Sequence, residues 1–195
     1  MDTFYARIRI RGINMDSYAV YMQAVDLVRQ CGTRDPLKIA CELGISVYHA
    51  PLDDLLGMFT FRWNHRIMLI NENLDHYMEQ MVAGHELGHD RRHRELAKAG
   101  GMKEFTLFNM KDTTEYEANA FSAHILLDND DVYGLARQGY DVVQVAHMLN
   151  SDINLMLIKM QEMNKLGYDF TIPNSPDSRF FRRIKGGELG SDASD

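Results

Sequence analysis

The sequence predicts an α+β fold in which helices pack with a small β-sheet. Apolar residues recur at helical spacing over most of the chain, whereas residues 57–71 alternate with the period of two that is typical of strands. The chain has 195 residues, of which 45% are hydrophobic. It can therefore bury the core of one domain, alone or with a small appendage.

The elements at the start of the chain follow from capping signals. Residues 1–14 alternate Arg and Ile in part, and they are expected to be a leader that is either a short strand or disordered. A helix should begin near Met15, with Asp16 or Ser17 as its cap and a glycine at its end. A second helix should begin at Pro36, because proline suits the first helical turn.

The middle of the chain carries the expected sheet and two longer helices. Residues 45–52 read as a strand, and residues 57–71 read as a β-hairpin with Asn64 in its turn. Residues 74–96 and 113–127 have helical spacing. The segment between these two helices is expected to be an irregular link.

Three segments divide the chain after the leader. We expect a main domain over residues 15–130 and, packed on it, a helical extension shaped like a helix-turn-helix over residues 131–170. Residues 171–195 should form an irregular tail, because prolines, glycines and mixed charge favour disorder there.

Composition narrows the classes of function. The net charge of −7 at pH 7 disfavours a protein that grips nucleic acid through its phosphates. Two cysteines are too few for a disulfide scaffold, so reduced thiols are expected. The sequence has neither an apolar stretch of membrane-spanning length nor a signal peptide. A soluble cytoplasmic protein is therefore expected, without direct contact to nucleic acid or membrane.

The stretch "MVAGHELGHDRRH", residues 81–93, holds the most informative motif. At about 100° per residue, His85 and His89 share a stripe with apolar residues such as Met81, and this stripe should face inward. Two histidines one turn apart can bind one metal ion, and Glu86 between them can act as general base.

This H-E-x-x-H pattern predicts a zincin-like metallopeptidase domain with one zinc ion per chain. Zinc lowers the pKa of its water to about 7 and polarises the scissile carbonyl, while Glu86 would take the proton. The alternative is a chance match whose histidines only fill the core. The apolar position of both histidines favours the metal site, because a chance match would more often lie on the wet face.

A catalytic zinc needs a third protein ligand, and the helix at 113–127 offers two candidates. Glu115 and Glu117 lie about 200° apart around a helix, so both cannot face one metal. Thr114 and Glu117 fit a capping box, which would give Glu117 a structural role, although Asp112 is an alternative cap slightly earlier. The side of Glu115 also carries small residues that would allow close helix packing: Ala118, Asn119 and Ser122.

Together these motifs resemble those of a known family. "HELGH" followed by "EYEANAFSAHILL", with "DPLKIACELGISV" and "IMLINENL" upstream, is similar to the ImmA/IrrE family of metallopeptidases over most of residues 35–165. The resemblance implies that Glu115 is the third zinc ligand, beside His85 and His89. The chain departs from the usual family pattern at "ILLDND", which lies at the end of the helix and not at the ligands.

The resemblance also implies a regulatory protease. Such proteins are anti-repressors of phages and mobile genetic elements, or act in a stress response, and they cleave a helix-turn-helix (XRE-type) repressor encoded nearby. The expected activity is therefore zinc-dependent cleavage of a repressor, which relieves repression of transcription. In zinc peptidases of this build an edge strand pairs with the substrate, so the hairpin is either that edge or plain core sheet.

Supporting residues and two rival functions stay open. Candidates for stabilising an oxyanion or supporting the ligands are His65, His93, Tyr116 and Asn119. Residues 90–94 are expected to be a solvated helix end. The methionines of the extension form either an adaptable contact surface or core. In one rival the chain is a non-hydrolytic binding or sensor module that docks a repressor. In the other it is a DNA-binding regulator through its C-terminal helices, which carry few cations.

Overall fold

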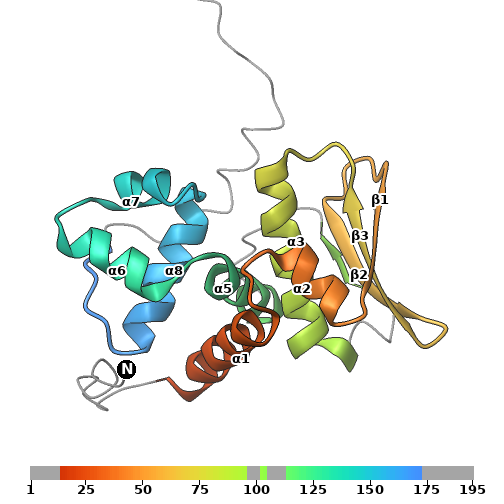
Figure 1. The fold of residues 1–195 in the computed structure, drawn as a ribbon, viewed down its shortest axis with the longest axis horizontal. Helices are drawn as coiled ribbons and strands as arrows, with labels where there is room; N and C mark the ends of the chain where they lie inside the picture. The colour runs from red at the N-terminus through yellow and green to blue at the C-terminus, as the bar shows by residue number, and fades with distance from the viewer. Residues whose placement is uncertain (1–13, 96–101, 105–112, 173–195) are drawn as a thin grey trace, which may run out of the picture.

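A computed structural model describes residues 14–95, 102–104 and 113–172, so nearly all of the expected leader and most of the expected tail lie outside it. The fold is α+β, as predicted (Figure 1). In chain order the elements are α1 (Met15–Cys31), α2 (Pro36–Glu42), β1 (Ser46–Ala50), β2 (Gly57–Arg62), β3 (His65–Asn71), α3 (His76–Arg92), β4 (Met102–Glu104), α5 (Thr113–Leu126), α6 (Asn129–Arg137), α7 (Val142–Met148) and α8 (Ile153–Lys165).

Helix starts are set by side chains that cap free backbone N–H groups. Asn14 caps α1, and its Oδ1 accepts from the backbone N–H groups of Asp16 and Ser17 at 3.0 and 3.2 Å. The predicted cap at Asp16 or Ser17 is therefore wrong by two or three positions. Asp75 caps α3 in the same way, through the backbone N–H of Met78 at 2.8 Å.

The sheet has four strands in the order β1-β3-β2-β4. The predicted hairpin is confirmed, because β2 and β3 are antiparallel and Arg62 pairs with His65. Trp63 and Asn64 form its turn with φ values of 48° and 64°. Positive φ at both positions is the backbone shape that suits a two-residue hairpin, although Asn-Gly is the usual sequence for it.

The structure corrects one expectation about the sheet and favours one of the two alternatives for the hairpin. Among the described residues β3 lies between β1 and β2, and the first half of β2 lies between β3 and β4. Most of the hairpin is thus core sheet, which is one of the two alternatives that the sequence left open. Residues 102–104, expected in an irregular link, form the edge strand β4. Periodicity could not show this, because three residues are too few for a pattern and their partner is distant in the chain.

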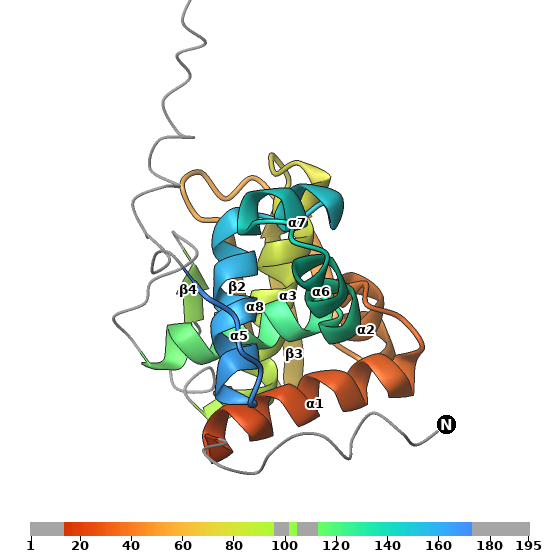
Figure 2. The same ribbon diagram turned by 90° about the vertical axis from the view of Figure 1, so that its left-hand side faces the viewer.

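Helix α3 lies at the centre of the fold. One side of α3 contacts β2 and β3, and α5 packs against it on the side away from the sheet (Figure 1). Helices α1 and α8 contact α5. Helices α6 and α7 lie on the side of the fold away from the sheet (Figure 1), and they stand in front when that side faces the viewer (Figure 2). No described helix is both long and apolar enough to cross a membrane.

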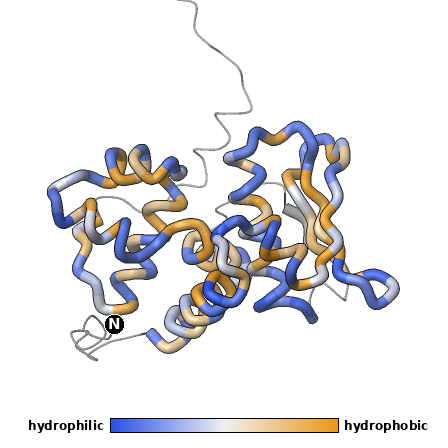
Figure 3. Tube along the Cα trace, in the orientation of Figure 1, coloured by the Kyte–Doolittle hydropathy of each residue, from blue (hydrophilic) through white to orange (hydrophobic). Residues whose placement is uncertain are grey.

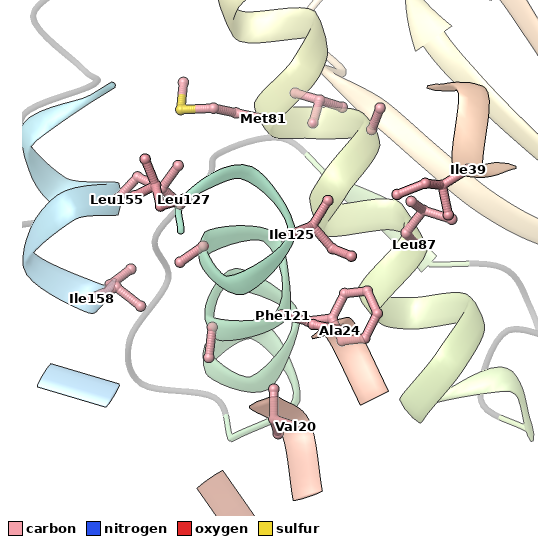
Figure 4. Close-up of a cluster of buried hydrophobic side chains, with 14 of the residues drawn as sticks. Val20, Ala24, Ile39, Met81, Leu87, Phe121, Ile125, Leu127, Leu155 and Ile158 are labelled. Atoms are coloured by element: carbon pink, nitrogen blue, oxygen red, sulfur yellow. The ribbon is translucent and has the colours of Figure 1, made fainter. Parts of the chain in front are cut away.

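The buried apolar cluster runs through all of these layers. Figure 4 shows Phe121 and Ile125 of α5 near Leu87 of α3. Figure 3 shows that hydrophobic segments gather where these helices and the sheet meet, whereas the hairpin turn is hydrophilic. The methionines of α8 (Met156, Met160 and Met163) belong to the core, whereas Met148 of α7 is 51% exposed. The division of the chain at residue 130 stays a prediction.

Candidate metal centre

Helices α3 and α5 approach each other closely because two glycines of α3 face α5. A Cβ on Gly88 would lie 2.8 Å from Cα of Ala118, and a Cβ on Gly84 would lie 2.5 Å from Oγ of Ser122. Such distances are below ordinary contact, so a larger residue at either position would push the helices apart. The expectation that small residues permit this approach is confirmed.

The close approach brings three side chains together. The Nε2 atoms of His85 and His89 lie 2.9 Å apart. Glu115 of α5 completes the group, with Oε2 at 3.2 Å from Nε2 of His85 and Oε1 at 3.6 Å from Nε2 of His89. One potential ligand atom from each residue lies within 4.8 Å of the others.

This donor set fits a divalent ion such as zinc. Zinc binds imidazole nitrogen and carboxylate oxygen at about 2.0–2.2 Å, so ligand atoms around a tetrahedral ion are roughly 3.4 Å apart. The separations between His85, His89 and Glu115 lie close to that value. Glu115 is the most exposed of the three, with 18% of its side chain accessible, so solvent reaches the group from its side.

The surroundings leave Nε2 of both histidines available as a potential ligand. Nδ1 of His85 lies 3.0 Å from Oδ1 of Asn119, and an amide oxygen can only accept. His85 therefore carries its proton on Nδ1 and leaves Nε2 as a potential ligand. Burial lowers the pKa of His89 to about 4, so its imidazole is neutral near pH 7.

His93 and Glu117 form a second layer behind His89. Nδ1 of His93 lies 3.2 Å from Nδ1 of His89, and Nε2 of His93 lies 3.4 Å from Oε2 of Glu117. Arg92 donates from Nε to the same oxygen at 2.8 Å. Burial lowers the pKa of His93, whereas Glu117 acts to raise it. Glu117 of α5 therefore serves an ion pair with Arg92, whereas the predicted capping box stays a prediction.

The last turn of α3 is not the solvated end that its charges predicted. Asp90 is fully buried, and it accepts from Nη1 of Arg66 on β3 at 3.1 Å. Arg94 donates to the same carboxylate from Nε at 3.2 Å and from Nη2 at 3.1 Å. The ion pairs attach the end of α3 to the sheet, one residue beyond His89.

Glu86 lies on the sheet side of the group. Its side chain is fully buried, and a Cβ on Gly57 of β2 would stand 3.1 Å from its Oε1 and 2.6 Å from Cγ1 of Val82. The absence of a side chain at Gly57 thus makes room for the carboxylate. Sequence reasoning missed Gly57, although a glycine at the start of a strand often marks a close approach.

The structure does not bring His65 to the group. His65 pairs with Arg62 at the hairpin turn, whereas Gly57 beside Glu86 pairs with Ile70 at the other end of β3. Five residues at about 3.3 Å each separate the two ends by roughly 17 Å. His65 is exposed there and no longer a candidate donor.

Tyr116 also points away from the group. Its hydroxyl donates to Glu162 of α8 and accepts from Nζ of Lys165 at 2.7 Å. Burial and the neighbouring Glu162 raise the pKa of Tyr116. Position 116 lies about 100° around the helix from Glu115, on the side that α8 covers. His124 faces α8 as well, where it contacts Lys159.

Comparison with known proteins identifies the family of the chain. The family model described as the IrrE N-terminal-like domain, peptidase M78, matches residues 40–160. The chain is also 33% identical over 116 residues to an uncharacterized immunity region protein 2 of Bacillus phage phi105, which spans 58% of this chain and 72% of the phage protein. The matched region contains α3, α5 and the three potential metal ligands. The chain therefore belongs to the ImmA/IrrE family, the peptidase family M78.

Proposed function

We propose that the chain is a zinc-dependent endopeptidase of zincin-like build. His85, His89 and Glu115 would hold one zinc ion per chain, and Glu86 would be the general base. The convergence of these three donors from two helices carries the proposal. The match to a peptidase family supports it.

The residues divide the chemistry between them. A bound zinc ion would supply Lewis-acid activation of the attacking water and the scissile carbonyl. Glu86 follows His85 on the same helix, so its carboxylate can take a proton from the attacking water. The same carboxyl group can then deliver that proton to the leaving amine. Burial of Glu86 beside Gly57 keeps bulk solvent from competing for the proton.

We further propose that the substrate is a helix-turn-helix repressor of a phage, mobile element or stress operon. The phage phi105 relative is named as an immunity region protein, which supports a role in such an element. The family resemblance in the two motif helices supports a repressor as the target. Cleavage would then relieve repression of the operon.

The DNA-binding alternative loses support from the position of α8. In a helix-turn-helix reader the second helix must be open to the major groove. Most of α8 is buried instead, and its Lys159 is only 1% exposed. The non-hydrolytic binding module stays an alternative, because docking of a repressor needs no general base.

Co-expression with a helix-turn-helix repressor from the same gene neighbourhood tests the proposal. Wild-type protein should cut the repressor at a defined bond, as fragment masses would show. Glu86→Gln should bind zinc as the wild type does and yield no fragments, because it removes the general base. Relief of repression by Glu86→Gln without fragments would instead establish the binding module. An intact repressor beside zinc-loaded wild type would contradict peptidase action on that target.

A further inference from the structure

The two histidines of the proposed zinc site have different partners behind them. His85 contacts the neutral amide of Asn119 at 3.0 Å. His89 contacts a second imidazole, that of His93, at 3.2 Å, and Glu117 lies behind His93. Asn119 and Glu117 both come from α5, the helix that also supplies Glu115. Helix α5 thus provides one potential ligand, the partner of His85 and the partner of His93.

Hydrogen-bonding rules assign the protons in the pair of His89 and His93. Only one of the two facing Nδ1 atoms can carry a proton, since a hydrogen bond needs one donor and one acceptor. Glu117 as a carboxylate can only accept, so neutral His93 carries its proton on Nε2, toward Glu117. Nδ1 of His93 must then accept from His89. This leaves Nε2 of His89 unprotonated, facing His85 and Glu115.

The chain of contacts is held in place at its outer end. Arg92 donates from Nε to Glu117 at 2.8 Å and from Nη1 to Gln23 of α1 at 3.3 Å. The side chains of Arg92, His93 and Glu117 are 16%, 10% and 24% exposed, so water competes little for the contacts among these three, whereas Gln23 is exposed. Helix α1 thereby connects to the metal centre through three side chains.

We propose that His93 and Glu117 are positioning residues that hold His89 in its metal-binding tautomer and so raise the affinity of the site for zinc. The inference rests on the proposed zinc site and adds no residue that touches substrate. Outer partners of metal-binding histidines fix ring orientation, and their loss typically costs about 10–100-fold in metal affinity.

The test is the Zn²⁺ affinity of the purified full chain, measured by competition with a chromophoric chelator. His93→Leu should weaken binding about 10–100-fold. His93→Asn should restore most of the affinity, because its Oδ1 can accept from His89 as Asn119 does from His85. The zinc affinity of Glu117→Ala should lie between those of His93→Leu and His93→Asn, since His93 stays in place but can exchange tautomer. Glu79→Gln is the matched control. Glu79 lies elsewhere on α3, where it contacts His76 of the same helix and His49 of β1.

Each outcome decides one point. A wild type that binds no zinc defeats the proposed function itself. A wild type that binds zinc with the same affinity as His93→Leu defeats only the positioning role. Thermal melts of the metal-free variants show whether they fold. Should His93→Leu fail to fold, long-range ¹H–¹⁵N spectra of the zinc-loaded wild type decide instead. A proton on Nε2 of His93 supports the inference, and a proton on its Nδ1 overturns it.

Discussion

Gly88 of α3 lies so close to Ala118 of α5 that a Cβ on Gly88 would stand 2.8 Å from Cα of Ala118. The neighbour is backbone and cannot swing aside as a side chain can. The distance between the two helices sets how far Glu115 reaches toward His85 and His89. The packing of α3 against α5 and the geometry of the metal centre therefore depend on the same distance between the two helices.

Gly88→Ala should destabilise the protein and weaken metal binding together. Overpacking costs about 1–3 kcal/mol, and a 2.8 Å contact with backbone favours the upper part of this range, above the roughly 1 kcal/mol that alanine contributes over glycine in a helix. Urea unfolding and zinc titration measure the two effects. Gly134→Ala in α6 is the control, because a Cβ there meets nothing within 4 Å and should stabilise the protein. Equal effects of the two substitutions would show that the helices can separate without consequence.

The hairpin turn should gain stability when its tryptophan is replaced. Trp63 has φ 48° and is 89% exposed, so it occupies a left-handed conformation without burying its ring. That conformation costs most residues about 1–2 kcal/mol, whereas asparagine tolerates it. Trp63→Asn should therefore raise the free energy of unfolding by about 1 kcal/mol in urea titrations. Trp63→Ala keeps the Cβ and should show little gain, and an equal gain would assign the effect to the exposed indole.

Lys159 should make stability depend on pH. It is fully buried between α8 and α5, and its Nζ donates to Nδ1 of His124 at 3.0 Å. Burial, aided by the cation of Arg34 and opposed by Asp128 and Glu162, lowers the pKa of Lys159 from 10.5 to about 7. Between these two values the unfolded chain binds the proton that the folded chain has lost. Stability therefore rises with pH in this window, by at most about 1.4 kcal/mol per unit.

Comparison with Lys159→Met isolates this contribution. Thermal melts of both proteins from pH 7 to about 9 should show the wild type gaining stability relative to the variant as pH rises. Other titrating groups are common to both proteins and cancel in the difference. Parallel curves would mean that Lys159 stays charged in the folded protein.

Local signals in the sequence predicted much of the fold and the centre of the site. The spacing of His85 and His89 on an apolar helix face, and the turn at Asn64, depend on residues near one another in the chain. In the structure the two histidine side chains lie side by side, and Asn64 lies in the hairpin turn. The start of α1 near Met15 was predicted, but its cap was misplaced because Asn14, Asp16 and Ser17 are all good caps.

The sequence did not predict features that depend on contacts between segments far apart in the chain. β4 takes the edge beside β2 from over thirty residues further along the chain, so the hairpin alone could not reveal that it is central. Tyr116 adjoins Glu115 in sequence but turns toward α8, which only the packing of three helices decides. The contact of Glu117 with Arg92 and His93 likewise requires α3 and α5 side by side.

The most direct test of the metal centre is the zinc content of purified protein. Wild type, Glu115→Ala and the control Glu79→Ala are reconstituted with zinc, dialysed and analysed for metal. Wild type and Glu79→Ala should each retain close to one zinc per chain, and Glu115→Ala should lose most of it, because two histidines alone hold zinc weakly. A wild-type protein that retains no zinc after reconstitution would contradict the metal centre and the peptidase activity built on it.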